Sequence, residues 1–117
     1  MSQSRSFKDL VVWQKSLVLV KEVYRITQIL PSVEQFGLMS QLRRAAVSIP
    51  SNIAEGAKRG TQKDFTQFLR IASGSAAEIE TQLILVESLY PNIDCDYAIE
   101  LLNEVQKMLT ALIQKIR

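Results

Sequence analysis

The sequence predicts an all-α protein, an antiparallel up-and-down four-helix bundle whose second helix bends at Pro50. Apolar residues recur at the i, i+3, i+4, i+7 spacing of an amphipathic helix along four long stretches. Pro31, Gly60 and Pro91 separate these stretches, and no segment alternates with the period of two that a strand needs. The 117 residues suit a single domain, with helices at about 8–30, 34–58, 62–90 and 95–116.

The first predicted helix carries more apolar surface than a four-helix bundle needs. Its apolar arc is roughly 200° wide, against about 100° for an ordinary surface helix. Val11, Val18 and Ile29 fall near its polar edge. We therefore expect a second buried seam and self-association of the chain. Scattered surface aliphatic side chains are the alternative interpretation.

Proline and glycine mark the second predicted helix. It begins at Ser32 or Glu34, and Pro50 removes one backbone donor from its interior, so we expect a bend near residues 48–52. Gly56 and Gly60 fit its exit, because helix ends tolerate glycine well.

The third and fourth predicted helices have polar residues at their starts. Thr61 is the expected N-cap of the third helix, with Asp64 completing a capping box. The small residues at 72–77 would let another helix approach closely. Asp94 or Asp96 is the expected cap of the fourth helix.

The composition excludes several kinds of chemistry. Histidine is absent and Cys95 is the single cysteine, which rules out a histidine-based triad, a Cys/His zinc site and an intrachain disulfide. Glu55 with Glu78, and Asp94 with Asp96, are possible carboxylate pairs, but no nucleophile–base arrangement accompanies them. We expect no enzyme activity, no cofactor and no metal.

The termini and the hydropathy give an expected location. The first residues are polar and lack the apolar core of a signal peptide. No window approaches the ~18 consecutive apolar residues of a membrane span. We expect a soluble cytoplasmic protein with no membrane partner.

The net charge of +2 hides an uneven distribution. Residues 1–70 hold 11 Lys and Arg against 5 Asp and Glu, whereas residues 71–117 hold 3 against 7. A basic surface that contacts phosphates is one interpretation. The other is attraction between oppositely charged helices, within the bundle or between subunits.

Polar residues on the second and third predicted helices suggest a structural network. Arg44 or Arg43 would pair with Glu78, and Asn52 would satisfy carbonyl groups freed by Pro50. A ligand or nucleic-acid contact is the alternative. The residues of this network are Gln41, Arg44, Ser48, Asn52, Glu55, Glu78 and Gln82.

A second candidate site is basic. The turn at residues 58–63 is rich in Lys and Arg, and with nearby arginines it would contact phosphates in a backbone-directed way. A solvated turn is the alternative. The candidate nucleic-acid-binding residues are Arg43, Arg44, Lys58, Arg59, Lys63 and Arg70.

Two continuous segments resemble a known family. The run from Phe36 to Gly56, which includes Gln-Leu-Arg-Arg-Ala-Ala-Val-Ser-Ile-Pro-Ser-Asn-Ile-Ala-Glu-Gly, is similar to the signature of the 23S rRNA intervening-sequence proteins. The segment from Phe65 to Leu83 and the opening at residues 7–13 are similar as well, so the resemblance spans residues 7–116.

The resemblance implies a bacterial four-helix protein that assembles as a homopentamer, with no established biochemical role. A related branch comprises the accessory variability proteins of diversity-generating retroelements, which bind nucleic acid and a reverse transcriptase. Carried onto this chain, that relation implies RNA or a nucleic-acid-associated protein as a partner. The rival hypothesis is a protein-interaction or scaffold module without a nucleic-acid role.

Overall fold

The computed structural model describes residues 6–116, and the regular structure within them is helical. Four long helices form the chain: α1 (Val11–Ile29), α2 (Leu38–Lys58), α3 (Gln62–Leu89) and α4 (Asp96–Ile116). Two single-turn 3-10 helices, η1 (Phe7–Asp9) and η2 (Ser32–Glu34), precede α1 and α2. The described residues contain no strand. The prediction of an all-α protein with four helices is therefore confirmed.

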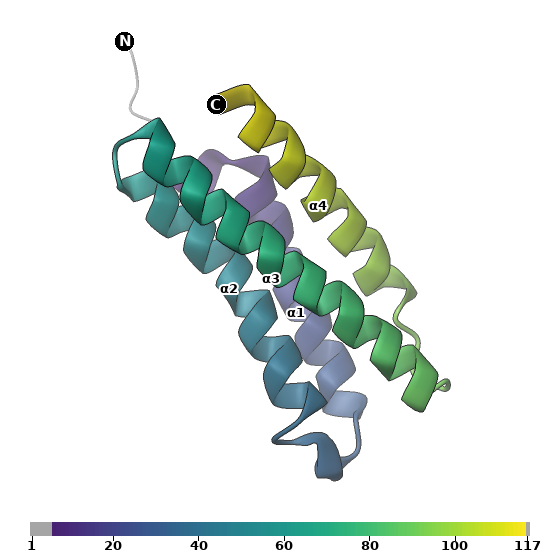
Figure 1. Cartoon of the computed structure of the whole chain (residues 1–117). Helices are drawn as coiled ribbons and strands as arrows, with labels where there is room; N and C mark the ends of the chain where they lie inside the picture. Colours follow the sequence, from purple (N-terminus) through teal and green to yellow (C-terminus); the bar gives the residue numbers. More distant parts are fainter. Residues whose placement is uncertain (1–5, 117) are drawn as a thin grey trace.

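The helices lie side by side in an elongated molecule of 51 × 23 × 21 Å, and the chain reverses direction at each connection (Figure 1). The contacts between α2 and α3 follow this reversal. Ser48 of α2 is hydrogen-bonded to Ser75 of α3, whereas Gly56, later in α2, faces Phe68, which is earlier in α3. Each helix packs on the next, and α4 packs on α1, which closes the bundle.

The two ends of the bundle hold different parts of the chain. One end, which we name the α2–α3 end, contains the start of α1, the α2–α3 connection and the end of α4 (Figure 1). The opposite end, which we name the α1–α2 end, contains the α1–α2 and α3–α4 connections. Residues from distant parts of the sequence therefore meet at each end.

The helical periodicity forms one core between the four helices. Large aliphatic side chains from every helix are fully buried there, which removes apolar surface from water and stabilises the fold. Small residues let α2 and α3 pack closely. A Cβ atom added at Gly56 would lie 2.6 Å from the Cβ atom of Phe68. Representative core residues are Leu19, Ile26, Leu42, Ile49, Ile53, Leu69, Ile79, Leu83, Leu102 and Leu109.

The first two helices begin later than the sequence suggests. Ser6 accepts a hydrogen bond from the backbone N–H of Lys8 and starts η1, and Leu10 has an extended backbone (φ −72°, ψ 125°) that separates η1 from α1. Gly37 (φ −114°, ψ −113°) separates η2 from α2 in the same way. The apolar periodicity continues across Leu10 because its side chain still packs on the core. Periodicity alone therefore missed this break.

The ends of α2 and the starts of α3 and α4 have local causes. Gly60 has a φ of +92°, a left-handed conformation that favours glycine, and it terminates the turn after α2. The Thr61 side chain accepts a hydrogen bond from the Asp64 N–H, so its N-cap assignment is confirmed. Cys95, whose carbonyl accepts from the Ile99 N–H, lies at the N-cap position of α4, so neither predicted candidate occupies it. The Asp94 side chain still accepts a hydrogen bond from the Asp96 N–H at the start of the helix.

Pro50 lies inside α2, and the helical assignment continues through it. The predicted bend near residues 48–52 stays a prediction. Within residues 6–116, no helix is both long enough and apolar enough to cross a membrane.

Candidate nucleic-acid interface

Charge is divided between the two ends of the bundle. The α2–α3 end, taken as residues 6–20, 48–74 and 105–116, holds eight Lys and Arg against three Asp and Glu. The remaining described residues, 21–47 and 75–104, hold four against nine. The eight cations are Lys8, Lys15, Lys58, Arg59, Lys63, Arg70, Lys107 and Lys115, and among them Lys15 forms an ion pair at 3.6 Å with Glu104, a carboxylate counted with the remaining residues.

The fold therefore converts a charge difference along the chain into one along the long axis of the molecule. The basic start of α1, the basic α2–α3 connection and the basic end of α4 all meet at the α2–α3 end. Lys107 and Lys115 belong to the acidic half of the sequence and are not among the predicted nucleic-acid-binding residues. Their position in the second half of the fourth helix is the signal that would have placed them there.

The six predicted nucleic-acid-binding residues lie in two groups. Lys58, Arg59, Lys63 and Arg70 occupy the α2–α3 end. Arg43 and Arg44 lie 14 or more residues before Lys58, which is about 21 Å further along α2 at 1.5 Å per residue. The six residues therefore do not form one compact patch.

Arg43 is used within the bundle. Its Nε–H donates to the Thr27 hydroxyl at 2.8 Å, and its guanidinium carbon lies 4.4 Å from the centroid of the Tyr24 ring. Thr27 is fully buried and donates in turn to the Tyr24 carbonyl. These contacts attach α2 to α1, and they occupy a side chain that was predicted to contact phosphate.

The cations of the α2–α3 connection are exposed. Arg59 pairs with Glu55 at 2.9 Å and lies 4.8 Å from the centroid of the Phe68 ring, but about half of each charged side chain stays accessible. An ion pair this exposed contributes little stability. Lys58 and Lys63 are exposed and form no ion pair within residues 6–116. This connection can approach a polyanion without breaking a buried interaction.

Part of the predicted polar network exists, between α2 and α3. The Asn52 amide donates to the Ser48 carbonyl at 2.8 Å and to the Ser48 hydroxyl at 2.9 Å. The Ser48 hydroxyl is in turn hydrogen-bonded to Ser75 at 2.9 Å. Ser75 was not in the predicted network, although it belongs to the run of small residues at 72–77.

Other members of the predicted network are placed differently. Within residues 6–116, Glu78 forms no ion pair with Arg43 or Arg44, because Arg43 turns toward α1 and Arg44 is exposed. Glu55 pairs with Arg59, and Gln41 is exposed. Gln82 has a buried side-chain oxygen with no partner among the described residues.

The expected role of Asn52 toward Pro50 also needs correction. The missing N–H of Pro50 would have bonded the carbonyl four residues earlier, that of Ala46. The Asn52 amide instead bonds Ser48. Its contribution is the side-chain link between α2 and α3, which the spacing on one helix could not reveal.

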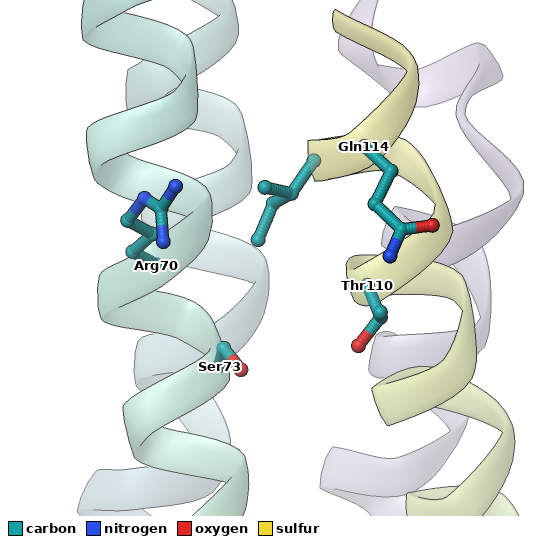
Figure 2. Close-up of a pocket in the computed structure, with 5 residues that line it drawn as sticks. Arg70, Ser73, Thr110 and Gln114 are labelled. Atoms are coloured by element: carbon teal, nitrogen blue, oxygen red, sulfur yellow. The ribbon is translucent and has the colours of Figure 1, made fainter. Parts of the chain in front are cut away.

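A polar groove opens between α3 and α4 near the α2–α3 end (Figure 2). Arg70 and Ser73 lie on α3, Thr110 and Gln114 face them from α4, and Ile113 of α4 also lines the groove. The groove has a volume of about 390 Å³. Arg70 is exposed and has no hydrogen-bond or ion-pair partner within residues 6–116. Of these residues, only Arg70 is predicted from the sequence as a binding residue.

The Cys95 thiol and the candidate carboxylates Glu55 and Asp94 lie in surroundings that do not activate them for catalysis. Cys95 is buried, and this burial raises the pKa of its thiol to about 11, which disfavours the reactive thiolate at neutral pH. Glu55 is paired with Arg59, and Asp94 accepts a hydrogen bond from the Asp96 N–H at the start of α4. Among residues 6–116, no group of three or more His, Cys, Asp or Glu side chains is arranged to hold a metal ion.

Comparison with known proteins agrees with the segments singled out in the sequence. The family model of the 23S rRNA-intervening sequence protein matches residues 8–111, which is most of the chain. A comparison with curated proteins found no match. The matched region includes all four helices except the last residues of α4. The chain therefore belongs to the 23S rRNA-intervening sequence protein family.

Proposed function

We propose that this protein is a non-enzymatic, cytoplasmic, self-associating four-helix bundle that binds RNA through its α2–α3 end. One observation carries the proposal: eight cations against three carboxylates gather at that end, whereas the opposite end is acidic. RNA is a polyanion, and the contacts of Lys and Arg with its phosphates supply most of the sequence-independent affinity with which a protein binds it. The exposed α2–α3 connection is the first element that such a ligand would meet.

A salt titration tests RNA binding. We expect the protein to bind a structured RNA at ~50 mM salt and to lose affinity steeply as the salt rises, because each phosphate contact releases counterions. The paired substitution Lys58→Gln and Lys63→Gln should weaken binding and flatten the salt dependence by about one to two in logarithmic slope. Fluorescence anisotropy with a labelled RNA measures both quantities.

The matched control replaces two exposed cations away from the α2–α3 end, Lys21→Gln and Arg44→Gln. This variant has the same net charge as the test variant and should bind as the native protein does. Absence of binding by the native protein at ~50 mM salt would refute the proposed function, since phosphate contacts are strongest there.

Self-association is proposed from an exposed apolar stripe on α1. Val11, Val18 and Ile29 are 60%, 39% and 53% exposed, and their spacing of 7 and 11 residues places them along one side of the helix. Exposed apolar stripes of this kind are typical of protein interfaces. We infer that this stripe packs against another copy of the chain, as a pentamer on the resemblance to the family.

Light scattering at micromolar concentration should give a mass about five times the 13.2 kDa of one chain. Val18→Lys should reduce that mass because it places a charge in the stripe, whereas Ile84→Lys, an exposed aliphatic position on α3, should leave it unchanged. A native protein that remains monomeric would contradict the inference.

A protein-interaction module is the second candidate function, and one observation favours it. Val33 and Phe36, in and beside η2 at the α1–α2 end, are 81% and 89% exposed. Two protruding apolar side chains suit contact with another protein better than contact with RNA. If Phe36→Ser changes assembly while no RNA binds, the scaffold function is correct and the RNA function is wrong.

A further inference from the structure

The groove between α3 and α4 continues to the tip of the α2–α3 end. Beside the hollow lined by Arg70 and Ser73 lies a second one of about 380 Å³, lined by Gln62, Lys63, Thr66, Gln67 and Ile116. On α3, Lys63, Thr66, Arg70 and Ser73 follow the spacing 3, 4 and 3, so they share one face of the helix. We name the two hollows together the α3/α4 trough.

The side chains of the trough suit an extended polyanion. Lys63 and Arg70 are separated by seven residues, which is about 10.5 Å along α3. Hydroxyl groups of Thr66, Ser73 and Thr110 and the amide of Gln114 add neutral hydrogen-bond donors beside the two cations. No acidic or aromatic side chain is among the described residues that line it.

Two other grooves of the described chain differ in character. The groove between α1 and α4 is lined mainly by apolar residues such as Leu10, Met108 and Leu112. A hollow at the start of α4 contains Glu87, Asp94 and Asp96 and would repel an anion. The α3/α4 trough combines neutral donors, a position at the basic end of the bundle and two cations that form no ion pair within residues 6–116.

Resting on the proposed RNA function, we propose that the α3/α4 trough holds the sugar–phosphate backbone of a single RNA strand. One phosphate lies at Arg70, where Ser73, Thr110 and Gln114 also donate hydrogen bonds, and another lies at Lys63 with Thr66. Arg is well suited to this role because its planar guanidinium binds two phosphate oxygens at once.

The shape and chemistry of the trough give the bound strand two properties. The two hollows have volumes of about 390 and 380 Å³, so the backbone of a flexible single strand can follow both of them more closely than that of a rigid double helix. Since no aromatic residue is present to stack on bases, the strand is held by its backbone with weak sequence preference.

Binding of a 12-nucleotide single-stranded RNA at ~50 mM salt tests the inference. Arg70→Gln should reduce the affinity about tenfold, as loss of a charge-assisted hydrogen-bonded contact does, and Thr110→Glu should reduce it further by placing a negative charge in the trough. Lys21→Gln is the control, because it removes an exposed cation of α1, a helix that lines neither hollow of the trough, and it should leave the affinity unchanged. Circular dichroism and thermal unfolding establish that each variant is folded.

Two further ligands identify the bound group. A duplex RNA of the same sequence should bind more weakly than the single strand and should lose little affinity on Arg70→Gln. Inorganic phosphate at millimolar concentration should compete poorly, because it reaches only one of the two cations. Displacement of the strand by millimolar phosphate would identify a free-phosphate site and overturn the proposal of an RNA strand.

The native chain provides an independent readout if a variant fails to fold. Addition of the single strand should shift the NMR amide resonances of Ser73, Thr110 and Gln114 and leave those around Arg44 in place. If RNA binds without these shifts and the Arg70→Gln variant binds as the native protein does, the proposal that the strand lies in the trough is wrong. The proposal of RNA binding at the basic α2–α3 end would then still stand. If no RNA binds at ~50 mM salt, the proposed function itself is wrong.

Discussion

Replacement of Gly56 by alanine is expected to destabilise the bundle by about 2 kcal/mol. The new Cβ atom would lie 2.6 Å from the Cβ atom of Phe68 and 3.2 Å from the Phe65 ring. The Phe68 Cβ atom is attached directly to the backbone of α3 and cannot rotate away, so α2 and α3 would have to separate. The resulting strain of about 3 kcal/mol outweighs the roughly 1 kcal/mol by which alanine favours a helix over glycine.

Gly74→Ala is the matched control for this prediction. Gly74 also lies inside a helix, but a Cβ atom added there meets nothing within 4 Å. This substitution should stabilise the protein by up to about 1 kcal/mol. Urea unfolding of both variants measures the difference in their free energies of unfolding, provided that the m-values are equal. Equal and small effects at the two positions would show that α2 and α3 do not pack as closely as described.

Asn52→Ala is expected to destabilise the protein by about 1–3 kcal/mol. The Asn52 amide donates two hydrogen bonds to Ser48, and Ser48 is hydrogen-bonded to the buried Ser75 of α3. Removal of the amide leaves this half-buried link between the helices incomplete. Equilibrium unfolding in urea measures the loss.

Gln41→Ala provides the comparison, since Gln41 lies on the same helix but is exposed. Its effect should remain within about 0.5 kcal/mol. A double substitution, Asn52→Ala with Ser75→Ala, should cost less than the sum of the two single changes because both belong to one network. Strict additivity would mean that Asn52 and Ser75 act independently.

Local patterns in the sequence predict the number and type of the helices. Helical periodicity, Pro31, Gly60 and the Thr61 cap act over a few residues, so they are visible without any tertiary information. The starts of α1 and α2 were predicted too early, because an apolar side chain such as Leu10 packs on the core from an extended backbone as well as from a helix.

The candidate site was predicted only in part. The cations at 58–63 and Arg70 follow from composition and position, whereas Thr110 and Gln114 were missed because they come from a helix about 40 residues away. Arg43 was predicted to contact phosphate, and its actual contacts with α1 were missed for a related reason. Its partners, Tyr24 and Thr27, lie on α1, and nothing in the local pattern of α2 indicates which way an arginine turns.

The sequence by itself determined an all-helical chain with an uneven charge and membership of a known family. Only the tertiary structure decided where that charge lies, which glycine is crowded and which polar residues meet. Helical periodicity and capping depend on neighbours within one or two turns. Contacts between helices depend instead on the direction and register in which the helices pack, and the sequence of one helix does not determine these. Examples are Gly56 against Phe68, Ser48 against Ser75, and Arg70 opposite Thr110.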